Sequence, residues 1–154
     1  MIGVAVEVRN AVAGDGNFLV ECNLAMALET ERKDLDRTVL TRGVEAVFAE
    51  PRHGFYLVAE RAGEPAGCLQ VTYEWSDWRN GDWWWLQSVY VVPSARRQGV
   101  FSALYADVER RARRADAVGL RLYVEQNNDR AQRTYAALGM RAEPYRMMFR
   151  KLRA

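Results

Sequence analysis

Residues 87–104 read QSVYVVPSARRQGVFSAL, which combines an apolar strand, a proline, a basic loop and the start of a helix. Val89, Tyr90 and Val91 have side chains typical of strands, and Pro93 has no N–H with which to extend a ladder. After Gly99, apolar residues recur at three-, four- and seven-residue intervals, which predicts a helix. A helix N-terminus behind a strand and a loop presents free backbone N–H groups, so these residues predict a site for a phosphate or pyrophosphate.

The loop itself has the side chains that such a site needs. Arg96 and Arg97 supply positive charge. Gly99 removes a side chain that would otherwise keep an anion away from the backbone. Charge, glycine and helix N-terminus therefore coincide within one short segment.

Residues 96–101, RRQGVF, resemble the pyrophosphate loop of the GNAT acetyltransferase superfamily. That loop has Arg or Gln, two further residues, Gly, one residue, and then Gly or Ala. The first four positions match, whereas Phe101 stands where a small residue is usual. So short a motif also occurs by chance in ordinary structural turns, and it needs a second element to support it.

The second element is residues 124–140, VEQNNDRAQRTYAALGM. In the same superfamily a strand is followed by Asn, by Ala three residues later, by Tyr seven residues after the Asn, and by a Gly-apolar pair. The matching residues here are Asn128, Ala131, Tyr135, Gly139 and Met140. Apart from any resemblance, Asn128 is typical of a helix cap and Gly139 of a helix stop, and seven residues place Asn128 and Tyr135 on one helix face.

The remaining chain predicts an α/β fold with a mixed, mostly antiparallel sheet and helices on both faces. Helices are expected from Asn17, from Asp36 as a cap, after Gly99, and from Asn128. Residues 61–65 predict a hairpin turn, after which Leu69, Val71, Tyr73 and Trp75 are expected to pack on one face. The resemblance adds a splayed pair of parallel strands. Strands are expected at residues 4–8, 55–60, 67–75, 83–91 and 120–124, with one or two more within 141–150.

Composition indicates one globular domain over residues 1–154, with 49% hydrophobic and 27% charged residues. No apolar run is long enough for a membrane span, and the N-terminus lacks the features of a signal peptide, so a cytoplasmic protein is expected. Cys22 and Cys68 are predicted to be two buried thiols. A single histidine, His53, excludes a multi-histidine metal centre, and no metal is expected.

The resemblance implies acetyl-coenzyme A as cosubstrate, lying against the strand before the loop. Tyr135 matches the superfamily's usual acid, which protonates the departing thiolate, and a backbone N–H near Val89 could stabilise the oxyanion. The plainer readings are a buried strand with an ordinary turn, and a core tyrosine on an amphipathic helix. The cofactor-binding residues implied are Val89, Val91, Arg96, Arg97, Gln98, Gly99, Val100, Phe101, Ser102 and Asn128.

The general base is less marked in the sequence. A carboxylate, acting directly or through water, would help an alkylammonium lose its proton. Glu74 lies on the polar face of a strand beside the one that carries the cofactor site, and we favour it over Glu125, which follows the next strand. For either carboxylate, simple surface exposure is the better-supported reading.

These features predict an N-acetyltransferase that acts on a primary amine of a small molecule or a protein. One alternative is a non-catalytic acyl-coenzyme A-binding module, which would need no acid. Another is a basic nucleic-acid-binding domain, suggested by the arginines at residues 110–114 but supported by no motif. Five tryptophans within residues 75–85 could form core, a homodimer interface or an amine-binding wall. The acceptor and the oligomeric state cannot be read from the sequence.

Overall fold

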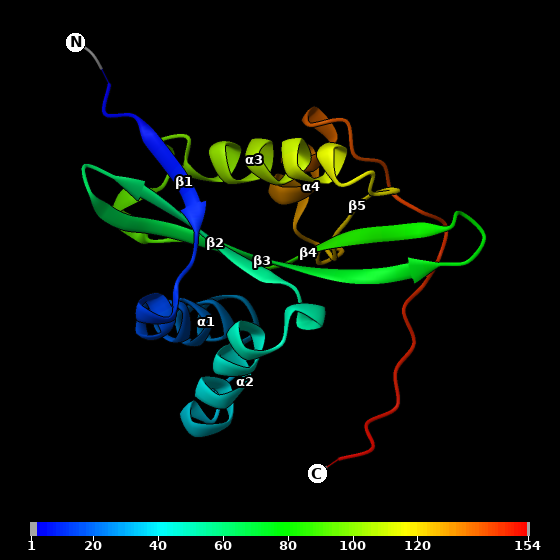
Figure 1. Cartoon of the computed structure of the whole chain (residues 1–154), viewed down its shortest axis with the longest axis horizontal. Helices are drawn as coiled ribbons and strands as arrows, with labels where there is room; N and C mark the ends of the chain where they lie inside the picture. Colours follow the sequence, from blue (N-terminus) through cyan, green and yellow to red (C-terminus); the bar gives the residue numbers. More distant parts are fainter. Residues whose placement is uncertain (1–2, 154) are drawn as a thin grey trace. The chain divides into compact units, whose positions relative to one another are not determined.

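The computed structural model describes residues 3–153, in two compact units that meet in sequence at Leu122 and Tyr123. The first unit contains one sheet of five strands in the order β1-β2-β3-β4-β5 (Figure 1). Pairing is antiparallel from β1 to β4 and parallel between β4 and β5, which confirms the predicted mixed, mostly antiparallel sheet. The strands are β1 Val6–Asn10, β2 Phe55–Arg61, β3 Glu64–Ser76, β4 Gly81–Val91 and β5 Gly119–Arg121.

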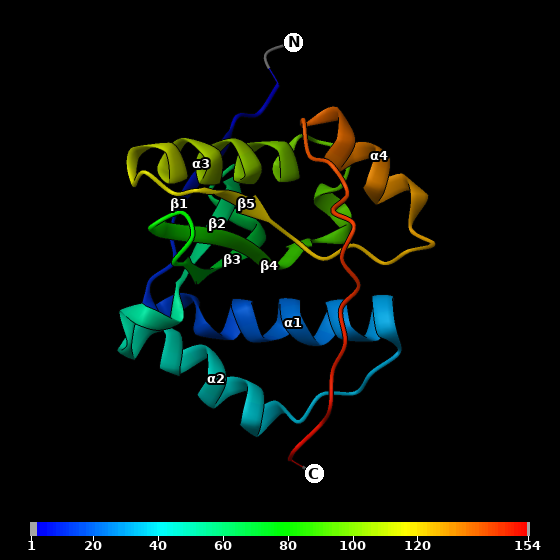
Figure 2. The ribbon, with the colours of Figure 1, turned by 90° about the vertical axis from the view of Figure 1, so that its right-hand side faces the viewer.

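Three helices cover the two faces of this sheet. Helices α1 (Gly16–Glu31) and α2 (Arg37–Ala49) lie on one face and α3 (Val100–Arg114) lies on the other (Figures 1 and 2). The predicted cap of α2 is present, since the Asp36 carboxylate accepts the N–H groups of Thr38 and Val39. Short 3-10 helices occur at η1 Ala13–Asp15, η2 Pro51–His53 and η3 Pro93–Ala95.

Apolar side chains from the helices and the central strands form the core of the first unit. Leu57, Leu69 and Val71 from the sheet are fully buried, as are Leu19 of α1 and Leu104 of α3. Cys22 and Cys68 are both buried free thiols, as predicted. Within residues 3–153, no helix combines the length and the apolar character needed to cross a membrane.

The β2–β3 hairpin forms where the sequence predicts it. Ala62 and Gly63 both have positive φ (52° and 77°), as a two-residue turn between twisted strands requires. The expected packed face of β3 is only half correct, because Tyr73 and Trp75 are exposed. The far half of the β3–β4 hairpin extends past α1, α2 and α3 (Figure 1).

The bounds of all five strands differ from the prediction by one to three residues, including those of β1 and β5. β1 begins and ends two residues later than expected, in register with β2. β5 covers Gly119–Arg121, not residues 120–124, and pairs with Trp83–Trp85 of β4. Gly119 lies against the Trp83 ring, where an added Cβ would come within 2.6 Å of the indole, so a glycine is needed for this close approach.

The second unit contains one helix, α4 (Asp129–Ala137), among its described residues. The strands expected within residues 141–150 were predicted wrongly, since residues 141–153 form neither strand nor helix in the structure. β-branched and aromatic residues favour a strand only where a neighbouring backbone is available to pair with. Tyr145, Met147, Met148, Phe149 and Leu152 are all exposed in this segment.

Candidate functional site

The predicted anion-binding loop joins the end of β4 to the start of α3. Arg97 and Gly99 both adopt left-handed backbone conformations, with φ of 62° and 81°. Left-handed residues at such a turn direct successive N–H groups to one side, which is how backbone nests bind anions. A left-handed conformation is costly for arginine, and strain of this kind is concentrated at functional sites.

The first turn of α3 extends this row of donors. The first hydrogen bond of the helix runs from the Ala103 N–H to the Gly99 carbonyl at 3.0 Å, so the N–H groups of the first turn precede the helix's own hydrogen-bond ladder. Val100 is buried against Gly67 of β3, where a Cβ would come within 2.8 Å of the valine side chain. A glycine in the neighbouring strand therefore allows the helix start to approach the sheet.

The edge of β4 next to the loop is open on one side. β4 pairs with β5 through Trp83–Trp85, and beyond Trp85 its pairing within the described residues is with β3. A bulge interrupts that pairing, with Ser88 at a positive φ of 49°. Val89 and Val91 lie on this part of β4, and bulges are frequent next to active sites because they redirect backbone groups. The predicted pair of parallel strands is present as β4 and β5, and their pairing ends at Trp85 and Arg121.

The two loop arginines differ in their surroundings. The Arg96 guanidinium makes an ion pair with Glu29 of α1 at 2.8 Å and donates to the Val91 carbonyl at 3.0 Å. Arg97 is exposed, and no ion pair involving it is found among residues 3–153. Of the two predicted cofactor-binding arginines, Arg97 is thus the one with a guanidinium available to a phosphate.

The Gln98 side chain is also engaged. Its carbonyl oxygen accepts a hydrogen bond from Arg61 of β2, and its amide donates to the Ser94 carbonyl at 3.0 Å. Gln98 can therefore offer a ligand its main chain, with the side chain directed to the protein. Phe101, which departs from the family pattern, is half-buried and lies 6.1 Å from the Tyr105 ring, measured between centroids.

Glu74, the candidate base, lies on β3, opposite the end of β4 that is far from the loop. It is paired with Trp83, and Trp83 and Val89 are about 20 Å apart along the strand at about 3.3 Å per residue. Its carboxylate accepts hydrogen bonds from Trp85 at 2.8 Å and from Arg121 at 3.2 Å. The fold does not bring Glu74 near the loop, and its role as a base stays a prediction.

The tryptophans near Glu74 differ in burial and in the residues that they contact. Trp84 is buried and packs edge-on against Tyr73, while Trp78 is 89% exposed. The Arg121 guanidinium lies 3.9 Å from the centroid of the Trp83 ring, a cation–π contact. Core packing therefore explains part of the cluster, and exposed tryptophan remains at the hairpin end.

In the second unit, local hydrogen bonds define where α4 begins and ends. The Asn128 side chain accepts the Ala131 N–H at 3.1 Å, which confirms the predicted cap. Gly139 has φ of 91°, and the Met140 N–H donates to the Tyr135 carbonyl at 3.1 Å, as in a Schellman motif. Tyr135 is half-buried, and this burial raises the pKa of its hydroxyl, so the group stays protonated at neutral pH.

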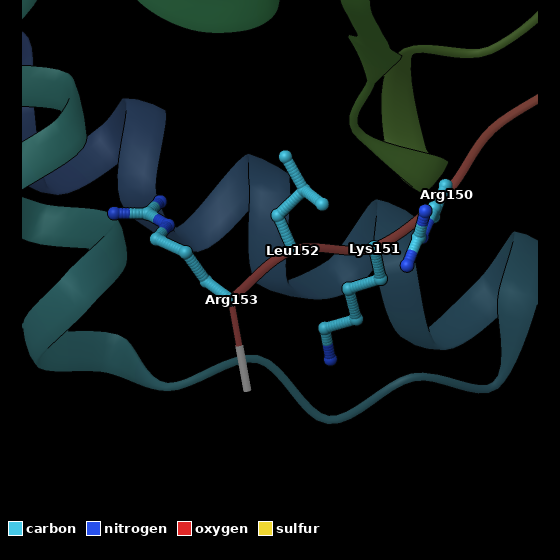
Figure 3. Close-up of a pocket in the computed structure, with 4 residues that line it drawn as sticks. All are labelled: Arg150, Lys151, Leu152 and Arg153. Atoms are coloured by element: carbon cyan, nitrogen blue, oxygen red, sulfur yellow. The ribbon is translucent and has the colours of Figure 1, made fainter.

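A surface pocket is found elsewhere, in the C-terminal segment. It is lined by Arg150, Lys151, Leu152 and Arg153, four consecutive residues (Figure 3). A ligand site normally needs polar groups that converge from several elements, and these four side chains point in different directions from one stretch of backbone. This pocket is distinct from the loop, and we assign no ligand to it.

Residues 24–140 match the model of the Acetyltransferase (GNAT) family, over the loop, the open edge of β4 and α4. The chain is a member of this family. A crystal structure of a possible acetyltransferase from Clostridium difficile 630 is 39% identical to it. That structure matches with a TM-score of 0.90 over 97% of this chain and 99% of the other.

More distant structures of the same fold include ligand complexes. The aminoglycoside N-acetyltransferase AAC(6')-Iy in complex with CoA is 18% identical, with a TM-score of 0.75 over 97% of this chain and 96% of that one. A predicted acetyltransferase with acetyl-CoA from Clostridium acetobutylicum is 15% identical, with a TM-score of 0.76 over 95% and 96%. At these identities the similarity extends to the fold alone. A search among curated proteins found no match.

Proposed function

We propose that this GNAT-family protein transfers an acetyl group from acetyl-coenzyme A to a primary amine. The observation that carries the proposal is the loop, in which left-handed Arg97 and Gly99 lead into the N-terminus of α3 beside the open edge of β4. A nest of N–H groups with an available arginine fits a pyrophosphate, and an unpaired strand edge fits the amides of a pantetheine arm. Solved structures of this fold with CoA and acetyl-CoA support the same choice.

In the proposed reaction, a neutral amine attacks the thioester carbonyl carbon. A C–N bond forms, the negative charge moves to the carbonyl oxygen, and the C–S bond then breaks to release the thiolate. Backbone N–H groups near Val89 stabilise the oxyanion, and the Tyr135 hydroxyl donates a proton to sulfur and regains one from water. Burial raises the pKa of Tyr135, so its hydroxyl is protonated at neutral pH and has a proton to donate.

The amine must also lose a proton. Glu74 is already engaged by Trp85 and Arg121, and the Glu125 carboxylate accepts the Asn127 N–H at 2.9 Å. A carboxylate acting through water therefore fits better than direct contact. The acceptor we expect is an amine of a small molecule or a protein, in the cytoplasm.

Calorimetric measurement of coenzyme A affinity in Gly99 variants tests whether the loop binds the cofactor. Gly99 faces open space, so a new side chain would stand in front of the loop. We expect Gly99→Glu to bind coenzyme A roughly tenfold to a hundredfold more weakly, because like charges about 4 Å apart cost about 1–4 kcal/mol near a surface.

Gly99→Ala is the matched control, since it imposes the same backbone strain without the charge. It should lose much less affinity than Gly99→Glu. Equal affinity of the parent and Gly99→Glu would place the cofactor elsewhere. Coenzyme A binding with no thiol release from acetyl-coenzyme A across a broad amine panel would favour the non-catalytic module. Salt-sensitive DNA binding without coenzyme A binding would favour the nucleic-acid-binding alternative.

A further inference from the structure

Arg96, the first residue of the loop, directs its side chain back into the first unit. Its Nη2 lies 2.8 Å from Oε2 of Glu29, and its Nε donates to the Val91 carbonyl at 3.0 Å. Its guanidinium carbon is 5.4 Å from the centroid of the Tyr90 ring. Three separate contacts thus hold one side chain of the loop.

Glu29 is the common partner in this arrangement. It lies in the last turn of α1, and its second oxygen, Oε1, accepts the Tyr90 hydroxyl at 2.8 Å. Tyr90 is 8% exposed and belongs to β4. The hydrogen bonds from Arg96 and Tyr90 hold the pKa of Glu29 below its usual range, so the carboxylate is ionised at neutral pH. One carboxylate therefore links α1, β4 and the loop.

We infer that Glu29 is a positioning residue for the loop, acting through Arg96 and Tyr90. The loop contains a left-handed arginine, a conformation that persists only where surrounding contacts enforce it. Arg96 is anchored before this residue by Glu29, and Gln98 is anchored after it by Arg61. The anchors keep the N–H groups oriented before a ligand arrives, so less conformational entropy is lost on binding.

Simple electrostatics and a positioning role predict opposite changes in pyrophosphate affinity when Glu29 is removed. A carboxylate near an anion site repels the anion, and it also neutralises Arg96, so its loss alone would tighten the binding of a pyrophosphate. Positioning predicts weaker binding. The sign of the change therefore separates the two roles, on the premise, from the proposed function, that the loop binds coenzyme A.

The experiment is calorimetry with coenzyme A on the parent and on Glu29→Ala, with Glu21→Ala as control. Glu21 lies on the same helix and makes an exposed ion pair with Arg37, away from the loop residues. We expect roughly tenfold weaker binding for Glu29→Ala, in keeping with the loss of charged hydrogen bonds. Glu21→Ala should bind like the parent, and both variants should melt within a few degrees of it.

Two further variants sharpen the result. Glu29→Gln keeps an acceptor for Arg96 and a donor for the Tyr90 oxygen, so it should restore most of the affinity despite losing the charge. Tyr90→Phe removes one hydrogen bond and should cost about two- to threefold. In turnover, KM for acetyl-coenzyme A should rise in Glu29→Ala with kcat unchanged, because the chemistry is not touched.

The outcomes are separable. If Glu29→Ala binds coenzyme A as tightly as the parent, or more tightly, Glu29 is a counter-charge and the inference is overturned. Weak binding by Glu29→Ala and Glu21→Ala alike would also overturn it, since general loosening of α1 would then be the cause. If the parent itself binds no coenzyme A, the proposed function fails first and this inference fails with it.

Discussion

The two units of the chain differ in the contacts that stabilise each of them internally. The first has a buried core, and the loop after β4 is fixed by contacts such as Arg96 with Glu29, which are 67 positions apart in sequence. The second has no buried residue in α4, whose ends are defined by Asn128 and Gly139 a few residues away from their partners. The proposed cofactor loop therefore depends on tertiary structure, whereas the proposed acid, Tyr135, is carried by a locally specified helix.

The largest expected effect separates chemistry from folding in the second unit. Tyr135→Phe should lower kcat by roughly 10²–10⁴-fold, since it removes the general acid and keeps the ring. The melting temperature and coenzyme A binding should hardly change. Steady-state kinetics with a pre-steady-state check that chemistry limits turnover would measure this. Full turnover in the variant would make Tyr135 structural, and the thiolate would then leave with another donor.

The next effect tests the comparison with the same substitution in each unit. Leu104 of α3 is fully buried and Leu152 is 87% exposed. Leu104→Ala should lower the free energy of unfolding by about 2–5 kcal/mol, because it opens a cavity and loses apolar burial. Leu152→Ala should stay within about 0.5 kcal/mol of the parent. Denaturant titration measures both, and a loss above about 1 kcal/mol at Leu152 would mean that the C-terminal segment is covered in solution.

The smallest effect concerns the end of α4. Asn128→Ala removes the cap on the Ala131 N–H and should cost about 1 kcal/mol of local stability. Hydrogen exchange at Ala131 should then be roughly fivefold faster, with little change in global melting. Arg133→Ala, in the middle of the same helix, is the control. Unchanged protection at Ala131 would show that tertiary contacts, and not the cap, hold this helix end.

The sequence by itself determined the features that depend on near neighbours. The strand before Pro93, the helix after Gly99, the caps at Asp36 and Asn128 and the family all follow from short patterns. Each of these features is built from hydrogen bonds or steric limits within a few residues, so it leaves a local signal. The strands expected at residues 141–150 failed for the complementary reason, since a strand requires a partner that its own residues do not specify.

Only the tertiary structure decided how the loop is held. Arg96 and Arg97 are adjacent arginines with the same signal in the sequence. In the fold, however, Arg96 forms an ion pair with Glu29 and Arg97 is exposed. Tyr90 and Arg61 carried no functional signal, because their contacts with Glu29 and Gln98 follow no periodicity along the chain. Ion pairs between distant elements form only when packing brings charges together, and no local pattern records which charges those will be.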